Sequence, residues 1–251
     1  MVKFNKLLLC SFSIAIASSG QLAFGTTNYE TITIGTGASA KTAVYKVHDY
    51  SFDVGTPVKL RTQTTHFTGE AYNHANTVLT TAIPGLSLQV DPSPIGSGND
   101  YAHTVGIAEI DTGENFYDAA AIGFNSSLQS CASYSTWDFD SSGHLIGISL
   151  GSSTITDTCD NQTISTGLII MNTNRWPGLF GGTPPQDAQE HWLIHEFTHL
   201  LGVGHIWSLA PGDWCTSMMA QVVVHSPCDT MPAPTNYIDT DLELLHELGY
   251  R

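Results

Sequence analysis

Basic residues are scarce in this 251-residue chain. Lys and Arg total 8, against 23 Asp and Glu, so the formal net charge is -15. This balance argues against a nucleic-acid partner, because contact with phosphates needs a basic face. Anionic membrane surfaces are disfavoured for the same reason. A strongly acidic surface mainly keeps a protein soluble.

Long hydrophobic runs are also lacking, since a bilayer span takes roughly 20 apolar residues. The apolar stretch LLLCSFSIAIA follows two lysines and precedes small residues. This order predicts a secretory signal peptide over residues 1–25, with cleavage after Gly20 or Gly25. We therefore expect the mature protein, residues 26–251, to have no membrane span and to be secreted, outside the cell or into the periplasm.

Cysteine is rare, and the absence of any CxxC pair disfavours a four-cysteine zinc site. The cysteines that remain after the signal are Cys131, Cys159, Cys215 and Cys228. An even number in an exported protein predicts two disulfides. Three connectivities are open, and we favour the sequential one, Cys131–Cys159 and Cys215–Cys228, because it closes short loops. Free thiols are the alternative.

The chain has no internal repeat and no long linker, so we expect one domain after the signal. Residues 26–45 are rich in Thr, Gly and Ala and predict either one early strand or a loosely attached segment. Apolar alternation or β-branched runs predict strands at 56–64, 86–90, 103–110, 144–151 and 167–172. Helical periodicity predicts helices at 68–83, 187–202 and 240–249.

The helix at 187–202 is apolar over more than half of its circumference, which is typical of a central, buried helix. Asp187 is its predicted N-cap and Gly202 its C-terminal stop. In the last helix, Thr240 and Glu243 match a capping box.

One stretch, HEFTHLLGVGH (195–205), contains three histidines and a glutamate. His195 and His199 are four residues apart, so a helix places both imidazoles on one face. Two imidazoles so placed can bind one zinc ion at about 2.0–2.1 Å. Glu196 lies about 100° round the helix from His195. That position suits a general base acting on a water better than it suits a third ligand.

The third ligand is predicted beyond the helix end. Gly202 lets the chain leave the helix in a left-handed conformation, and Gly204 permits another tight bend. His205 then returns beneath the helix end. Burying these polar residues without a partner would be costly, and a metal ion offsets that cost. A structural zinc is the alternative, although it would normally add a fourth Cys or His, and none lies inside the motif.

The full spacing, HExxHxxGxxH, resembles the metzincin clan of zinc metalloendopeptidases, in particular matrixin-like catalytic domains. The resemblance implies an α+β fold. Its upper subdomain, about 45–202, would hold a twisted mixed β-sheet and two long helices. A smaller lower subdomain, about 203–251, would hold a methionine-bearing turn and the C-terminal helix. The partner would be a protein or peptide substrate, and we expect a monomer.

The resemblance also implies roles for individual residues. One catalytic zinc would be bound by His195, His199 and His205, with Glu196 as the general base. The methionine beneath the metal would be Met231, in the stretch CDTMPAPTNYIDTDLELLHELGY; Met218 and Met219 are the alternatives. The substrate site would be walled by residues that follow Met231, namely Pro232, Pro234 and Tyr237.

Members of this clan align an extended peptide along an edge strand of the sheet. Residues 144–151 are the candidate here. Some members carry a tyrosine where this chain has Ala233. Tyr237 is then either a substitute oxyanion donor or an aromatic residue of the wall. No cysteine lies between the signal and Cys131, so a cysteine switch is not expected.

Two nearby patterns are weaker signals. His191 lies four residues before His195, one turn too far back for a ligand, so we predict a packing or surface residue. The stretch DFDSSG (138–143) resembles the start of a calcium loop, but its twelfth position is Ser149 instead of Glu, which excludes a standard EF-hand. A looser Ca²⁺ site and an ordinary turn both stay open.

Two alternatives to a secreted endopeptidase stay open. The first is a secreted binding or adhesion protein on the same scaffold, with a structural zinc or vestigial activity; the intact Glu196 argues against it. The second is zinc-dependent hydrolysis of a non-protein amide.

Overall fold

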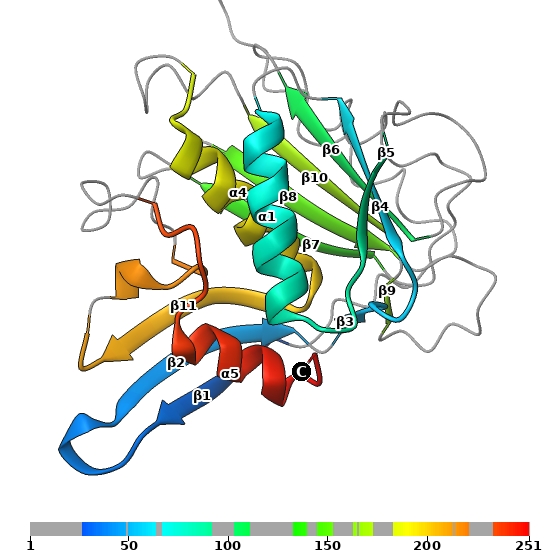
Figure 1. Ribbon diagram of the computed structural model, residues 1–251. Helices are drawn as coiled ribbons and strands as arrows, with labels where there is room; N and C mark the ends of the chain where they lie inside the picture. The colour runs from blue at the N-terminus through cyan, green and yellow to red at the C-terminus, as the bar shows by residue number, and fades with distance from the viewer. Residues whose placement is uncertain are drawn as a thin grey trace, which may run out of the picture.

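The computed structural model describes eleven stretches of the chain. They are residues 27–48, 50–63, 67–91, 103–110, 133–139, 145–152, 163–164, 166–172, 183–212, 214–220 and 233–250. Helices and β-sheets both occur in them, which agrees with an α+β fold. Figure 1 shows a large sheet beside two helices, with a smaller sheet and a third helix below.

The largest sheet has six strands in the order β5–β4–β6–β10–β8–β7. In chain order they are β4 (Val58–Gln63), β5 (Leu88–Asp91), β6 (Thr104–Ile110), β7 (Ser133–Phe139), β8 (Leu145–Ser152) and β10 (Thr166–Asn172). The first four strands across the sheet are parallel, and β8 is antiparallel to both of its neighbours. The predicted mixed sheet is therefore present, and each of the five predicted strands forms.

The predicted edge strand, 144–151, is wrong. β8 pairs with β10 on one side and with β7 on the other. A strand paired on both sides has no free row of backbone groups to which a peptide could be added. Among the described strands, the sheet ends on this side at β7, in the sequence SYSTWDF, for which we predicted no strand.

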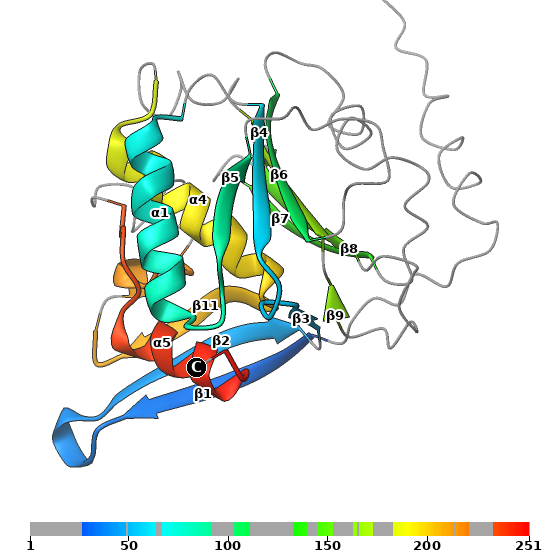
Figure 2. The same cartoon turned by 45° about the vertical axis from the view of Figure 1, so that its right-hand side comes forward.

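Helices α1 (Gly69–Ala82) and α4 (Gln186–Leu200) lie on the same face of this sheet (Figure 2). Thr68 caps α1, because its hydroxyl accepts a hydrogen bond of 3.1 Å from the N–H of Ala71. Apolar residues one and two turns apart on α1 are buried, as the periodicity predicts. In the described part of the chain, no helix is both long and apolar enough to cross a membrane.

The predicted helix caps differ from those in the structure. Pro185 precedes α4, and Asp187 lies inside the first turn. In α5 (Asp239–Glu247) the carboxylate of Asp241 accepts from the N–H of Ile238, at 3.1 Å. The Thr240–Glu243 capping box is therefore wrong. The N-cap is Ile238, two residues earlier than the predicted Thr240, so that Asp241 takes the N3 position.

The N-terminal segment is a hairpin, neither a single strand nor loosely attached. β1 (Thr27–Ile34) and β2 (Lys41–His48) pair along their whole length, with the short helix η1 (Gly37–Ser39) between them. β2 also pairs with β11 (Val203–Ala210), which gives a three-stranded sheet in the order β1–β2–β11. The smaller part of the molecule thus contains residues 27–48 as well as residues from 203 onward.

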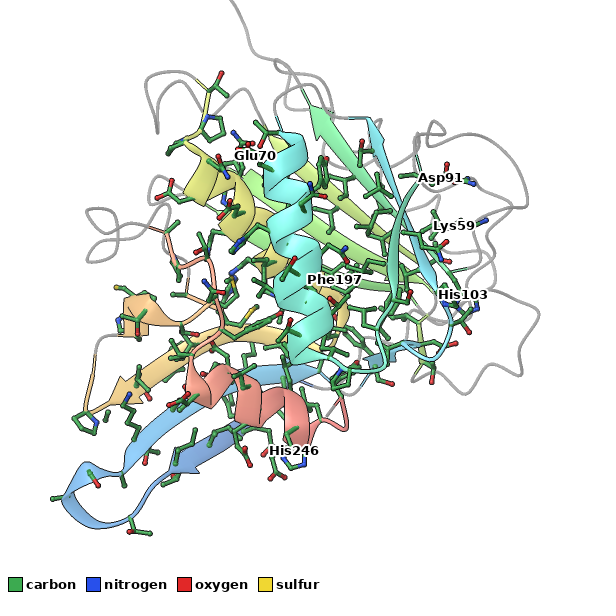
Figure 3. All side chains as sticks on the ribbon, viewed as in Figure 1. Lys59, Glu70, Asp91, His103, Phe197 and His246 are labelled. Carbon is green, nitrogen blue, oxygen red and sulfur yellow. The ribbon has the colours of Figure 1, made fainter. Side chains whose placement is uncertain are left out.

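The remaining short elements and the core complete the fold. β3 (Ser51–Phe52) pairs with β9 (Thr163–Ile164), and η3 (Trp214–Thr216) follows β11. Phe197 of α4 is buried behind α1 in Figure 3, whereas His246 lies on the outer side of α5. Among the described residues, buried apolar side chains from the three sheets and from α1, α4 and α5 form one continuous core around α4.

Candidate metal centre

Helix α4 carries two of the predicted ligands through the interior of the molecule. Every residue from Ala188 to Leu200 is buried, including His195 and His199. An imidazole at this depth needs partners for its ring nitrogens, because burying an unpaired polar atom is costly.

Each of these imidazoles directs its Nδ1 atom at a backbone carbonyl. His195 Nδ1 lies 2.7 Å from the oxygen of Met218, and His199 Nδ1 lies 2.7 Å from the oxygen of Val203. A carbonyl oxygen can only accept, so Nδ1 carries the proton and donates it. In the neutral imidazoles Nε2 is then a lone-pair acceptor, which is the form that binds a metal.

The two Nε2 atoms lie 3.0 Å apart. Two lone pairs at that distance repel each other unless a shared proton or a metal cation lies between them. Two nitrogen ligands at 2.0–2.1 Å from a tetrahedral ion are themselves roughly 3.3 Å apart, which is close to the separation found here. The donor set therefore fits a divalent cation.

The chain turns back at Gly202, immediately after α4. Gly202 has φ +87°, and a Cβ there would lie 2.3 Å from the carbonyl oxygen of Tyr50. The same segment supports the helix end: the Tyr50 hydroxyl donates to the oxygen of His199, and the His48 N–H donates to the oxygen of Gly202, each at 2.8 Å. Only glycine fits both this conformation and this close approach.

The third histidine comes from β11 and not from the helix. Val203 pairs with Val47 and Ile206 with Tyr45, and the register shifts between these two pairs, where His205 lies. Such an irregularity re-aims a side chain relative to a regular strand. One ligand atom each from His195, His199 and His205 then lies within 4.8 Å of the others.

These three histidines can hold a metal ion. Among the residues that the structure describes, no other group of His, Cys, Asp or Glu gathers in this way. The predicted ligand set is thus brought together by two elements, α4 and β11, that meet at the Gly202 turn.

Glu196 is buried directly beside the first ligand. The helix sets its side chain about 100° round from His195, on the flank of the ligand-bearing face. Its role as the general base that exchanges a proton with a water at the centre stays a prediction.

The carbonyl that holds His195 belongs to a buried turn, Ser217–Met219. Asp241 of α5 fixes this turn by accepting from the Ser217 hydroxyl at 2.6 Å and from the Met218 N–H at 2.9 Å. The Tyr45 hydroxyl of β2 also donates to Asp241, at 2.7 Å. A chain of hydrogen bonds therefore leads from the N-terminal hairpin through Asp241 and Met218 to His195.

Burial shifts the pKa values of two members of this network, Asp241 and Tyr45. Burial raises the pKa of Asp241, although hydrogen bonds from Ser217, Met218, Tyr45 and Ile238 act in the opposite direction. The pKa of Tyr45 is also raised, first by burial and then by the nearby Asp241 carboxylate. Tyr45 therefore keeps its proton and acts as a donor.

The segment that precedes α5 runs alongside α4. His191 Nδ1 lies 2.8 Å from the oxygen of Pro234, and the Tyr237 hydroxyl lies 2.5 Å from Thr198 Oγ1. His191 is buried with its ring centroid 5.2 Å from that of His195 and is not in the ligand cluster, so its predicted packing role is confirmed. The bond to Thr198 favours Tyr237 as a packing residue over an oxyanion donor.

Several predicted residues lie outside the described residues: Met231, Pro232, Cys131, Cys159 and Cys228. Their roles stay predictions. Cys215 is disulfide-bonded. Of the DFDSSG stretch, the first two residues end β7 and the others are outside the described part of the chain. Within the described residues, the carbonyl of Met218, one of the two alternatives to Met231, contacts His195.

No protein-family model matches this chain, and no curated protein matches it either. The resemblance to metzincins therefore stays a prediction from the HExxHxxGxxH spacing, and the structure adds only that the three histidines lie close together.

The sequence did not predict the residues that support the ligands, chiefly Tyr45, Ser217 and Asp241. Asp241 had a local signal, since an acid in the first turn of a helix stabilises it. Its partner Tyr45 is 196 positions away in the chain, and no local pattern predicts such a pair.

Proposed function

We propose that this protein is a secreted zinc endopeptidase of the metzincin type. The observation that carries the proposal is the cluster of His195, His199 and His205, with ligand atoms within 4.8 Å of one another. The buried Glu196 beside it supports hydrolysis over a purely structural metal site.

The donor set favours zinc. Three neutral imidazoles are typical ligands of a catalytic zinc, whereas Mg²⁺ and Ca²⁺ prefer oxygen ligands. Carbonyl partners on Nδ1, such as those of His195 and His199, fix the ring orientation and make Nε2 a better donor. When bound, zinc leaves a position for water, lowers the pKa of that water to about 7 and polarises a carbonyl group.

The residues of the chain supply the proton transfers. Glu196 takes a proton from the attacking water and delivers it to the nitrogen that leaves. Because Glu196 is buried, less bulk water competes for its proton, which favours proton transfer between Glu196 and the reacting groups. The Met218 carbonyl and Asp241 keep His195 in the orientation that the reaction needs.

Two further features support parts of the proposal. Met218 lies in a buried turn whose carbonyl holds the first ligand, so we assign it the role of the methionine in the turn beneath the metal. The disulfide at Cys215 supports export, because disulfides persist in oxidising compartments.

The test is a comparison of Glu196→Ala with Asp187→Ala, a matched loss of an acid at the start of the same helix. Both variants should bind one zinc per chain. Glu196→Ala should lose peptide hydrolysis by about 10²–10⁴-fold, and Asp187→Ala should retain it. Cleavage sites are measured by N-terminal profiling of a proteome digest. Full activity of Glu196→Ala would refute the mechanism.

The same experiment separates the two alternatives. A wild-type protein that binds zinc and a glycan or host protein but cleaves no peptide is a binding protein on this scaffold. One that cleaves only small amides is a non-peptide hydrolase.

A further inference from the structure

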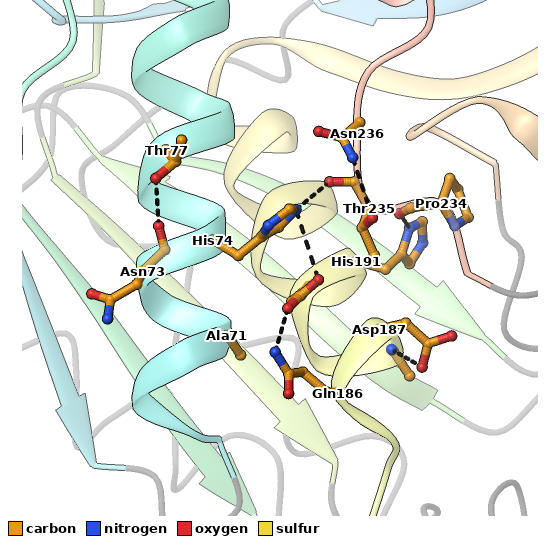
Figure 4. Close-up of polar contacts among 12 residues, drawn as sticks. Ala71, Asn73, His74, Thr77, Gln186, Asp187, His191, Pro234, Thr235 and Asn236 are labelled. Carbon is orange, nitrogen blue, oxygen red and sulfur yellow. Dashed lines mark hydrogen bonds and ion pairs between the residues drawn. The ribbon is translucent and has the colours of Figure 1, made fainter.

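Two histidines from different helices hold the same short segment, Ala233–Asn236. His74 of α1 places Nε2 2.8 Å from the oxygen of Thr235, and His191 of α4 places Nδ1 2.8 Å from the oxygen of Pro234 (Figure 4). Because carbonyl oxygens only accept, both imidazoles donate. Two successive carbonyl groups are thus tied to the two helices that cover the sheet.

An acidic side chain lies beside the donating nitrogen of His74. Glu190 Oε2 is 3.7 Å from His74 Nε2, and Glu190 Oε1 accepts from the Gln186 amide at 2.8 Å. Glu190 thus lies near the same nitrogen that donates to Thr235. The clamp consists of His74 and His191.

The clamped segment borders the metal centre. On α4, His191 and His195 are one turn apart, and Thr198 follows on the same side. The segment reaches α4 at His191 through Pro234 and again at Thr198 through Tyr237. It therefore passes the turn of α4 that carries His195, whose ring centroid is 5.2 Å from that of His191.

The segment is also accessible. Ala233, Pro234 and Thr235 are half-buried and Asn236 is exposed, so a bound molecule can reach them. A backbone held at two successive carbonyls beside a metal site presents a fixed surface to whatever binds there.

The family resemblance already implies that this region walls the substrate site; we propose that His74 and His191 are the positioning residues that hold residues 233–236 in that place. The wall limits the size of the substrate side chain that fits beside the scissile bond. This inference rests on the proposed function, and it adds the residues that decide which peptides are accepted.

The test uses metal-binding probes that need no turnover. Acetohydroxamate reaches only the metal, whereas a peptidyl hydroxamate with a leucine-like side chain also contacts the wall. Affinities are measured by visible absorbance of the Co²⁺-loaded protein. The variants are His74→Leu, which removes the donor, His74→Gln, which keeps an N–H at a similar reach, and Thr77→Ala. Thr77 lies on α1 and bonds only to Asn73 among the contacts drawn in Figure 4.

His74 is one-third exposed as a side chain, so we expect His74→Leu to fold. It should change the affinity for the peptidyl probe by about three- to tenfold, the effect of one hydrogen bond, with acetohydroxamate binding unchanged. His74→Gln should restore the wild-type value, and Thr77→Ala should keep it. With peptides, the effect should appear in KM and in side-chain preference more than in kcat.

Equal changes for both probes would show that His74 acts through the metal ligands and would overturn the inference. No change for either probe would also overturn it, because the segment would then be no wall. A wild-type protein that binds both probes but cleaves no peptide would refute the proposed function and leave the clamp standing.

Discussion

Gly202 and Gly249 follow α4 and α5 with the same backbone conformation, φ +87° at both. Their surroundings differ. A Cβ at Gly202 would lie 2.3 Å from the oxygen of Tyr50, whereas nothing lies within 4 Å of a Cβ at Gly249. Alanine meets the same left-handed strain at both positions and a collision only at Gly202. Comparing Gly202→Ala with Gly249→Ala therefore isolates the collision.

The expected magnitudes follow from these contacts. Left-handed alanine costs about 1–2 kcal/mol, which is the whole effect expected at Gly249. At Gly202 the Tyr50 carbonyl must also move away. That movement breaks two hydrogen bonds, from the Tyr50 hydroxyl to His199 and from the His48 N–H to Gly202, at about 1 kcal/mol each. Gly202→Ala should then cost about 3–4 kcal/mol in unfolding free energy.

Urea unfolding of the metal-free protein, with its disulfides intact, measures both values. Gly202→Ala should also weaken Co²⁺ binding, because the turn determines where His205 lies, whereas Gly249→Ala should not. Equal losses of stability in the two variants, or unchanged Co²⁺ binding by Gly202→Ala, would refute the reasoning.

Two further predictions concern the buried tyrosines. Tyr45→Phe removes the donor to Asp241, so it should lower the unfolding free energy by about 1.5–3 kcal/mol and weaken Co²⁺ binding. Tyr29→Phe, at an exposed site, is the control. The prediction fails if both variants have the stability and Co²⁺ affinity of the wild type. Burial raises the pKa of Tyr45, Tyr237 and Tyr250, so their folded values exceed the unfolded value of about 10. Their contribution is therefore intact below about pH 10 and lost as the pH rises above it, by up to about 1.4 kcal/mol per pH unit for each tyrosine. Unfolding free energies at rising pH, with tyrosinate absorbance, test this; a stability that stays constant from pH 10 to 12 would contradict it.

Local patterns predicted most elements of this fold because they depend on nearby residues. The period of apolar residues located α1 and α4, and Gly202 marked the end of α4 through its left-handed conformation. The same patterns placed a strand at 144–151 but could not show that β7 covers its free side. Strand order depends on which distant segments pair, and alternation along one strand carries no information about that.

The same distinction holds for the metal site, where some features follow from the local sequence and others from tertiary contacts. The sequence alone determined that His195 and His199 share a helix face, because their spacing equals about one helical turn, and that the chain turns before His205. Only the tertiary structure decided that the N-terminal hairpin pairs with β11, that Asp241 holds the turn at Met218, and that His74 and His191 grip one segment. These contacts join residues far apart in the chain, and their geometry exists only when the sheets and helices have packed together.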